Sequence, residues 1–470
     1  MLFNSLKFLL FFPLVCMVYF AIRGTRWRNA FLLLASYFFY MNWKPVYALL
    51  ILSSTLITYF CGLLLDRPGS QKRKKLILAA SIVLNIGLLV IFKYHGMINE
   101  VVTAFLGVAG LHWRLPNFDV LLPVGISFYT FQAVGYAIDV YRGTVKAERN
   151  FVTYAVFVSF FPQLVAGPIE RAGSLLPQFR EKHSFNYHNV VEGVRQMLWG
   201  FFMKLCVADV LAEYVDAVYN NVSQHNGASM LIATVLFAFQ IYCDFGGYSN
   251  IAIGAARVMN FRLMENFRTP YLSADIGEFW KRWHISLSSW FKDYLYIPLG
   301  GSRVGKGRHI ANLMVTFVVS GLWHGANWTF LVWGVVHGVY QSVAVFWHRL
   351  FGNGVGKNRV SRLLGIVVCF LLVDFAWIFF RANTMSDAVS IVSKIFTDFG
   401  KPYIDVSSLT VGCASLCLLA IKDFSDTFGC KIHALHSSHI IVRYASFIFL
   451  VCYILLFGSL SGGQFIYFQF

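Results

Sequence analysis

The sequence predicts an all-α protein that crosses a membrane many times. Of its 470 residues, 57% are hydrophobic and 13% are charged, whereas soluble domains carry about a quarter charged residues. Apolar runs also recur from one end of the chain to the other, and many approach the roughly 20 residues that a bilayer span requires. We therefore expect on the order of eleven or more spanning or half-spanning helices.

The expected helices follow one another with little polar sequence between them. They cover residues 7–22, 29–40, 46–65, 76–92, 151–165, 191–211, 230–243, 310–346, 363–380 and 439–457. The first run lacks a basic leader and a small-residue cleavage site, so we expect it to remain as a helix. No fixed-period repeat and no long polar stretch divides the sequence. Residues 1–470 are therefore expected to form a single integral membrane domain.

Two of the apolar stretches are interrupted by glycine and proline. They are LLPVGISF at residues 121–128 and FPQLVAGPIE at residues 161–170. Non-helical backbone persists at membrane depth only where protein or a wet cavity surrounds it. The interruptions therefore predict re-entrant segments around an internal chamber.

The formal net charge of +17 is concentrated in a few clusters. The clearest are residues 23–28, 67–75 and 281–308. In an integral membrane protein such clusters predict cytoplasmic loops, with anionic lipid or an anionic cofactor as secondary partners and no role for nucleic acid. Two apolar runs separate the first two clusters, which predicts that both face the cytoplasm and that the N-terminus lies outside. We expect a multi-pass protein of the cytoplasmic (inner) membrane.

One polar interruption, residues 278–301, mixes charges with aromatic residues. Drawn as one helix, it has a stripe consisting of Trp283, Leu287, Trp290 and Tyr294. An adjacent stripe holds His284, Ser288 and Phe291. This pattern fits a functional segment. It fits equally well a helix that lies on the membrane surface and whose basic residues touch lipid phosphates.

The stretch GLWHGANW, residues 321–328, places His324 between two apolar runs. Ionisable residues within membrane spans mark a function or a specific partner, although a neutral histidine that donates to a carbonyl is the simpler interpretation. Gly321 and Gly325 permit close backbone approach, and Asn327 supplies further hydrogen-bonding groups. His337, further along the next run, is expected to be a satisfied packing histidine.

Several other patterns do not support chemistry. GGSRVGKGR lacks the Ser or Thr and the preceding strand of a P-loop, so nucleotide hydrolysis is rejected. His433, His436 and His439 lack a further ligand and are expected to lie in a solvated loop, so no metal site is expected. There is no G-x-S-x-G elbow for a hydrolase serine. The nine cysteines stand singly, mostly within apolar runs, and are expected to pack rather than pair.

Two further features have simple interpretations. Asp139, Asp244 and Asp374 occur within apolar sequence and are expected to pair with Lys or Arg. The last six residues, FIYFQF, predict a stiff, strand-like tail. Tyr467 in that tail fits an aromatic belt at the lipid headgroups, or the protein interior if the tail is docked.

The longest motifs resemble those of a known family. WHISLSSWFKDYLYIPLGG and GLWHGANWTFLVWGVVHG are similar to sequences of the membrane-bound O-acyltransferase (MBOAT) family, in particular its bacterial alginate O-acetyltransferase branch. LLPVGISFYTFQ, FPQLVAGPIER and IYCDFGGYSNIAIG also resemble it. The motifs extend over about residues 120–340.

The resemblance implies a ring of tilted helices around a central tunnel. It implies that His324 is the catalytic histidine, that His284 is its partner, and that Tyr467 carries the acyl group in transit. It also implies acetyl-CoA as the cytoplasmic donor, with no permanently bound cofactor. The residues expected around the donor are Lys281, Arg282, Ser288, Asp293 and Asn327.

Three functions are compatible with these observations. The first is an O-acetyltransferase that moves acetyl groups across the membrane for an exported polysaccharide or cell-wall glycan, handing them to an extracytoplasmic acyltransferase. The second is D-alanyl transfer to teichoic acid, as in a related branch. The third is a transporter, which broken helices would suit but which usually shows two related halves.

Overall fold

The computed structural model describes residues 1–108, 123–165, 167–351, 358–429, 434–459, 465 and 466. Every regular element in these residues is a helix, which confirms the all-α prediction. Within these described residues, seven helices are long and apolar enough to cross a membrane, and two shorter apolar helices accompany them. The sequence-based number was larger partly because the run 191–211 is divided between two α-helices and an intervening π-helix.

The chain divides into two compact units. Unit 1 comprises residues 1–194 and 252–264, and unit 2 comprises residues 195–251 and 265–470. Two boundaries fall within α10 (Tyr187–Phe201) and α12 (Gly227–Val258), and the third lies in the loop between Met264 and Glu265. The single-domain expectation and the ring around a tunnel stay predictions.

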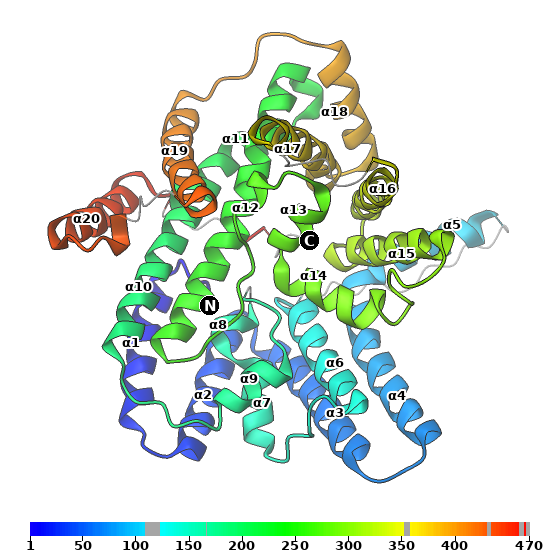
Figure 1. Ribbon diagram of the computed structural model, residues 1–470, viewed down its shortest axis with the longest axis vertical. Coiled ribbons are helices and arrows are strands. Elements are labelled where there is room, and N and C mark those ends of the chain that lie inside the picture. Colours follow the sequence, from blue (N-terminus) through cyan, green and yellow to red (C-terminus); the bar gives the residue numbers. More distant parts are fainter. Residues whose placement is uncertain (109–122, 166, 352–357, 430–433, 460–464, 467–470) are drawn as a thin grey trace. The chain divides into compact units, whose positions relative to one another are not determined.

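Unit 1 is built mainly from helices that precede α10 (Figure 1). They are α1 (Leu6–Ala21), α2 (Thr25–Met41), η1 (Pro45–Tyr47), α3 (Ala48–Asp66), α4 (Gln71–Leu89), η2 (Val90–Tyr94), α5 (His95–Val108), α6 (Ile126–Arg142), α7 (Phe151–Ser159), α8 (Phe161–Leu164) and α9 (Ala172–Gln178). Helices α3, α4 and α6 pack against one another, and α2 packs against α7. A Cβ on Gly62 would lie 2.6 Å from the Tyr136 hydroxyl, so α3 and α6 approach closely because this residue is glycine.

The two interrupted motifs meet inside unit 1. Gly125 has a left-handed backbone, with φ at +75°, immediately before α6. A Cβ at this position would lie 2.5 Å from the carbonyl oxygen of Leu164, at the end of α8. Ile169 and Glu170, which follow in the second motif, are also buried. Protein therefore surrounds the described parts of both interruptions, as the sequence predicts.

Unit 2 holds the remaining elements. They are η3 (Phe202–Ala208), α11 (Asp209–Tyr219), η4 (Val222–Gln224), η5 (Pro270–Leu272), α13 (Ile276–Arg282), α14 (Ile285–Phe291), η6 (Lys292–Tyr296), α15 (Lys306–His324), α16 (Trp328–Phe351), α17 (Arg359–Arg381), α18 (Met385–Thr397), α19 (Val406–Phe428), η7 (Ala434–His436) and α20 (Ile440–Phe457). Helices α15 and α16 form a close antiparallel pair, in which Gly321 faces Gly334.

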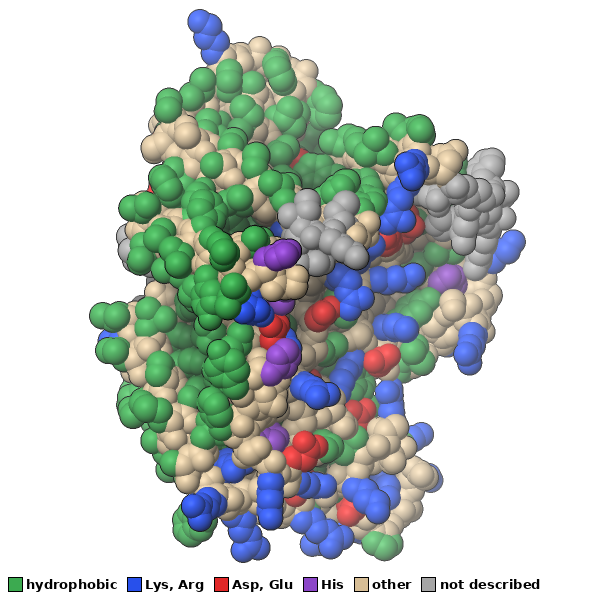
Figure 2. Space-filling view, turned by 60° about the vertical axis from the view of Figure 1, so that its left-hand side comes forward, with side chains coloured by type: hydrophobic (Ala, Val, Ile, Leu, Met, Phe, Trp, Pro, Cys, Tyr) green, Lys and Arg blue, Asp and Glu red, His purple; other side chains and the backbone are tan. Residues whose placement is uncertain are grey.

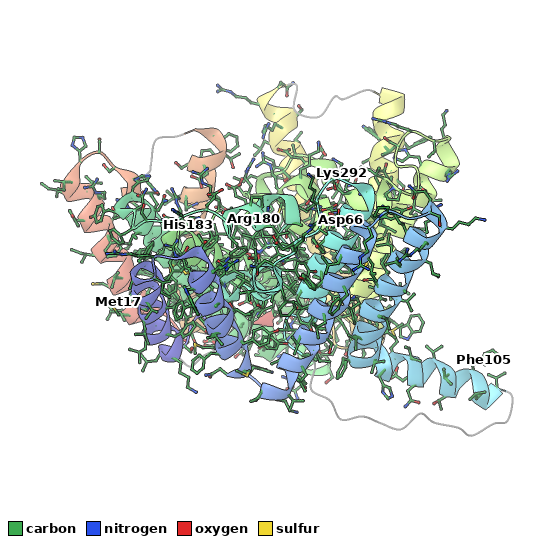
Figure 3. All side chains as sticks on the ribbon, turned by 90° about the horizontal axis from the view of Figure 1, so that it is seen from below. Met17, Asp66, Phe105, Arg180, His183 and Lys292 are labelled. Carbon is green, nitrogen blue, oxygen red and sulfur yellow. The ribbon has the colours of Figure 1, made fainter. Side chains whose placement is uncertain are left out.

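Part of the outer surface is apolar, as contact with lipid requires. Figure 2 shows hydrophobic side chains over much of the visible face. In unit 1, Met17 on α1 and Phe105 on α5 point outward (Figure 3), and 64% and 75% of their surfaces are exposed. Exposed Leu, Ile and Phe also line α20 in unit 2. Together with the apolar helices, this identifies a multi-pass membrane protein.

Candidate active site

The backbone breaks where one amphipathic helix was predicted. Helix α13 ends at Arg282 and α14 begins at Ile285, with a π-helix after it. His284, between them, has a left-handed backbone with φ at +43°, which is uncommon for a residue other than glycine. The prediction of a continuous helix over residues 278–301 is therefore wrong.

The same segment is buried rather than laid on the surface. Trp283, His284 and Leu287 each have 1% of their surface exposed. The Trp283 ring lies 4.9 Å from that of Phe267 and 5.0 Å from that of Trp377. A surface-lying anchor helix would expose its tryptophans to lipid, so this alternative is wrong for residues 283–291.

Asn266 fixes the position of His284. Its side-chain oxygen lies 3.0 Å from His284 Nδ1 and accepts a hydrogen bond from Ser286 Oγ at 2.8 Å. Its side-chain nitrogen donates to Ser249 Oγ at 3.1 Å, and its carbonyl accepts the Ile285 N–H at 2.9 Å. These bonds stabilise an otherwise unfavourable backbone and orient the imidazole.

The same bonds determine the tautomer of His284. The Ser286 backbone N–H also points to the Asn266 oxygen, at 3.4 Å, so this atom is the amide oxygen and an acceptor. Nδ1 of His284 must then be the donor, which leaves the ring lone pair on Nε2. Burial lowers the pKa of His284 from 6.5 to about 3, so the ring is neutral near pH 7.

His324 is the last residue of α15 and is buried with 4% of its surface exposed. Its ring centroid lies 5.0 Å from those of Trp323 and Trp333, and 5.2 Å from that of Phe380. A Cβ on the following residue, Gly325, would lie 2.2 Å from the Phe330 ring. The glycine therefore allows the close packing that the sequence predicts here.

The structure brings the two predicted histidines to the same tryptophan. The Trp323 ring lies 6.0 Å from that of His284 and 5.0 Å from that of His324. Residues 40 positions apart in the sequence thus flank one indole in unit 2. Both imidazoles are buried among aromatic rings, a setting that excludes bulk water from chemistry carried out there.

His337 packs in the interior as expected, but its hydrogen bonding differs from the expectation. It is fully buried, and its ring lies 4.8 Å from that of Trp333 and 5.0 Å from that of Trp280. Neither ring nitrogen has a hydrogen-bond partner among the described residues. It is therefore a packing histidine, but the prediction that its hydrogen bonds are satisfied is wrong. His436 and His439 are exposed, as expected for a loop, while His433 lies outside the described residues.

The expected pairing of buried carboxylates is confirmed for Asp244. Its Oδ1 lies 2.6 Å from Nζ of Lys204, which also contacts Asp209 Oδ1 at 2.6 Å. Asp374 is different, because in the part of the chain that is described it has no ion pair and its Oδ1 has no hydrogen-bond partner. The pairing of Asp374 with Lys or Arg is therefore wrong, and that of Asp139 stays a prediction.

The described part of the C-terminal tail is docked in unit 2. Phe465 is fully buried, and its ring lies 4.6 Å from that of Tyr248 and 5.6 Å from that of Phe245. The Phe245 ring is in turn 4.6 Å from that of His284. Ile466 is also buried, and neither it nor Phe465 belongs to a strand. Tyr467 lies outside the described residues.

The residues expected around the acyl donor are engaged in different ways. Arg282 donates to Glu278 at 2.6 Å and to Thr269 at 3.0 Å, so its charge is already paired. Lys281 is exposed, and Asp293 is half-buried.

The two remaining donor-site candidates make local hydrogen bonds. Ser288 Oγ donates to the carbonyl of Trp283 at 3.1 Å. Asn327 donates to the carbonyl of Asn383 at 3.0 Å and accepts the N–H of Thr329 at 3.1 Å. A role for any of these five residues in donor binding stays a prediction.

Sequence reasoning missed Asn266, Ser249 and Lys204. Asn266 lies in a polar loop with no motif around it, and Lys204 lies in an apolar run that ends at Leu211. An intramembrane lysine is itself a signal, since a buried cation requires a partner. The role of Asn266 depends on a contact across 18 residues and has no comparable signal in the sequence.

Comparison with known proteins identifies the family. Residues 146–378, which include both histidines, match the membrane-bound O-acyltransferase family. A probable alginate O-acetylase of Pseudomonas aeruginosa is 37% identical over 438 residues, covering 90% of this chain and 81% of that protein. A peptidoglycan O-acetyltransferase of Helicobacter pylori is 34% identical, over 83% of this chain and 79% of that protein. A teichoic acid D-alanyltransferase of Bacillus subtilis is 26% identical, over 57% of this chain and 71% of that protein.

Proposed function

The chain belongs to the membrane-bound O-acyltransferase family and is an O-acyltransferase, and we propose that it transfers acetyl groups from acetyl-CoA across the cytoplasmic membrane. The acceptor is an exported polysaccharide or a cell-wall glycan, reached directly or through a separate extracytoplasmic acyltransferase. The observation that carries this proposal is the pair of buried histidines, His284 and His324, whose rings both lie close to that of Trp323.

The relatives favour acetyl over D-alanyl transfer. Proteins named as alginate O-acetylases and as a peptidoglycan O-acetyltransferase match 83% or more of this chain at 34% identity or above. The teichoic acid D-alanyltransferases match only 55% and 57% of it, at 27% and 26% identity. An acetyl group is therefore the first acyl group to test.

In the proposed first step, His324 acts as the general base. Its imidazole takes the proton from an attacking hydroxyl while the oxygen forms a bond to the thioester carbonyl carbon. The carbon–sulfur bond then breaks, and CoA leaves as its thiol with the proton returned by the imidazolium. General base catalysis of this kind contributes about 10² to 10⁴ in rate.

His284 acts beside it as a neutral acceptor. The side-chain oxygen of Asn266 accepts the hydrogen bond of Nδ1, and burial lowers the pKa of the His284 ring to about 3. The ring is therefore uncharged, and its Nε2 lone pair accepts a hydrogen bond. We assign it to orienting the attacking hydroxyl, which lowers the cost of reaching the reactive geometry.

The hydroxyl of Tyr467 is the proposed first acceptor. The two residues before it, Phe465 and Ile466, are buried, and the ring of Phe245 contacts both Phe465 and His284. An acetyl ester on a phenol stays reactive, so a glycan hydroxyl can attack it in a second step. The acetyl carbon then bonds to the glycan oxygen, and the tyrosine phenol is regenerated with the released proton.

The proposal is tested with the purified protein in liposomes. Acetyl-CoA and a D-alanyl thioester are supplied separately, and thiol release and new ester formation are measured in each case. We expect acetyl transfer, and we expect it to be lost in Tyr467→Phe. Transfer of D-alanine alone would replace the proposed donor, and solute uptake without ester formation would support a transporter instead.

A further inference from the structure

A buried ion pair in unit 2 contacts the C-terminal tail. Asp244 on α12 uses Oδ1 for Lys204, while its Oδ2 accepts the backbone N–H of Ile466 at 2.7 Å. Side-chain exposure is 1% for Lys204 and 4% for Asp244. A backbone donor bound to a buried, ionised carboxylate makes a strong hydrogen bond. The tail is therefore held by its main chain as well as by the packing of Phe465.

The local structure of unit 2 is arranged to place Lys204 at this point. It lies in the π-helix η3, a rare element that often marks functional positions. A Cβ on Gly247 would lie 2.8 Å from the Gly200 carbonyl oxygen and 3.0 Å from the backbone nitrogen of Lys204. Only glycine at position 247 allows α12 to approach this segment so closely.

The same π-helix also contacts the beginning of the tail. The N–H of Ser459, two residues after α20, donates to the carbonyl of Leu205 at 3.0 Å. The Lys204 ammonium lies 5.6 Å from the centre of the Tyr248 ring, against which Phe465 packs. Residues 459 and 466 are thus both fixed to structures around one lysine.

We propose that Lys204 and Asp244 form a tail clamp that positions the C-terminal tail for acyl transfer. This inference rests on the proposed function, because the tail carries Tyr467 directly after the clamped residue. Lys204 pairs with Asp244 and orients its side chain, and Asp244 holds the main chain of Ile466. Both are positioning residues that act through the tail and do not contact the acyl group.

Asp209 provides a matched control for the clamp. It shares Lys204 with Asp244, yet among the described residues its side chain contacts neither Phe465 nor Ile466. Asp209→Asn and Asp244→Asn each remove one carboxylate from the same ammonium. Only the second change removes the negative charge from the group that accepts the N–H of the tail, so the hydrogen bond loses its charge assistance.

The first test measures hydrogen–deuterium exchange of the C-terminal peptide in the full-length protein. We expect exchange in Asp244→Asn to be about tenfold faster or more, as for loss of one charge-assisted hydrogen bond. We expect Asp209→Asn to resemble the wild type. Equal exchange in wild type and Asp244→Asn would overturn the clamp, as would equal acceleration by both substitutions.

A second variant tests the clamp without altering the ion pair, because loss of one buried charge can prevent folding. Ile466→Pro removes the N–H donor, and Ile466→Val is its control because it keeps that N–H. If both groups act through one hydrogen bond, acetyl transfer in Asp244→Asn/Ile466→Pro should be no slower than in the worse single variant. If the losses of acetyl transfer in the two single variants add fully in the double variant, the clamp is overturned.

Exchange and transfer together separate this inference from the proposed function. Faster tail exchange with unchanged acetyl transfer overturns the positioning role, whereas unchanged transfer in Tyr467→Phe overturns the Tyr467 relay. Unchanged exchange together with loss of transfer in Tyr467→Phe overturns only the clamp. Faster exchange with a matching loss of transfer supports both.

Discussion

Unit 1 buries charged groups, among them Glu148 and Glu170, but it also holds a neutral polar cluster that contrasts with the polar groups around the site in unit 2. In unit 1, Gln163 donates to the Gln132 side chain at 2.7 Å and to the Phe157 carbonyl at 3.0 Å, and Tyr154 donates to Thr58 at 2.6 Å. These groups are neutral and join helix to helix. In unit 2, the buried polar groups include two imidazoles and an ion pair that contacts the tail.

The difference separates scaffold from chemistry. Buried amides and phenols that are hydrogen-bonded to each other stabilise a unique packing. Buried imidazoles supply a lone pair or a proton at neutral pH, and a tail fixed by a carboxylate supplies a movable group at a defined place. Substitutions in unit 1 should therefore change stability, whereas those around His284 and His324 should change the rate.

The largest expected effect comes from His324→Ala. Removal of the general base should lower the acetyl transfer rate by about 10² to 10⁴, without preventing membrane insertion. The measurement is ester formation from acetyl-CoA by equal amounts of folded protein. His439→Ala, at an exposed histidine, is the control and should keep the wild-type rate; a similar rate in the two variants would refute the role of His324.

Asn266→Ala should be next in size. Loss of its side chain frees His284 to rotate and to change tautomer, and misplacement of a reacting group costs about 10² in rate. Asn29→Ala in unit 1 is the matched control, since Asn29 is also buried and donates to the Phe179 carbonyl at 3.0 Å. Steady-state rates per folded molecule should fall only for Asn266→Ala. Equal losses in both would remove the distinction between the units.

Gln132→Met in unit 1 should lower the stability of the protein without changing its transfer rate. Gln163 then loses the acceptor of its 2.7 Å hydrogen bond, and a buried donor left unsatisfied costs about 1–3 kcal/mol. We expect the free energy of unfolding in detergent to fall by this amount, while the transfer rate per folded molecule stays unchanged. A large loss of rate with normal stability would place chemistry in unit 1.

The last prediction concerns pH. Folding lowers the pKa of His284 from 6.5 to about 3, so between these values the unfolded chain binds a proton that the folded chain excludes. The resulting stability is complete above pH 6.5 and is lost as the pH falls towards 3, by up to about 1.4 kcal/mol per pH unit. Asn tolerates the left-handed backbone, so His284→Asn should show a flatter dependence of the unfolding free energy between pH 4 and 6.5. Identical slopes would mean that His284 is not buried as a neutral ring.

Much of the architecture could be predicted from the sequence, because hydropathy reports directly on helices in lipid. The helical class and the protein-enclosed interruptions near Gly125 and Leu164 followed from composition and from glycine and proline. The break at His284 did not, since a left-handed histidine depends on Asn266, 18 residues away. Periodicity alone favoured a continuous helix there.

The candidate site was predicted in part. Resemblance singled out His324 and His284, and the structure brings both to Trp323. Asn266, which orients His284, comes from a loop, and Lys204, which pairs with the carboxylate that holds the tail, comes from a π-helix; no local pattern in the sequence encodes these contacts. The same limit explains Asp374, which was expected to pair with a basic residue because such pairing is common in membranes.

The most direct test of the account is the fate of the acetyl group in a single turnover. Purified protein is mixed with acetyl-CoA without acceptor, quenched, and its C-terminal peptide is analysed by mass spectrometry. The account predicts one acetyl ester on Tyr467 in the wild type and none in His324→Ala. An unmodified tail in a wild-type protein that still releases CoA and acetylates an added acceptor, or equal acetylation in both proteins, would contradict it.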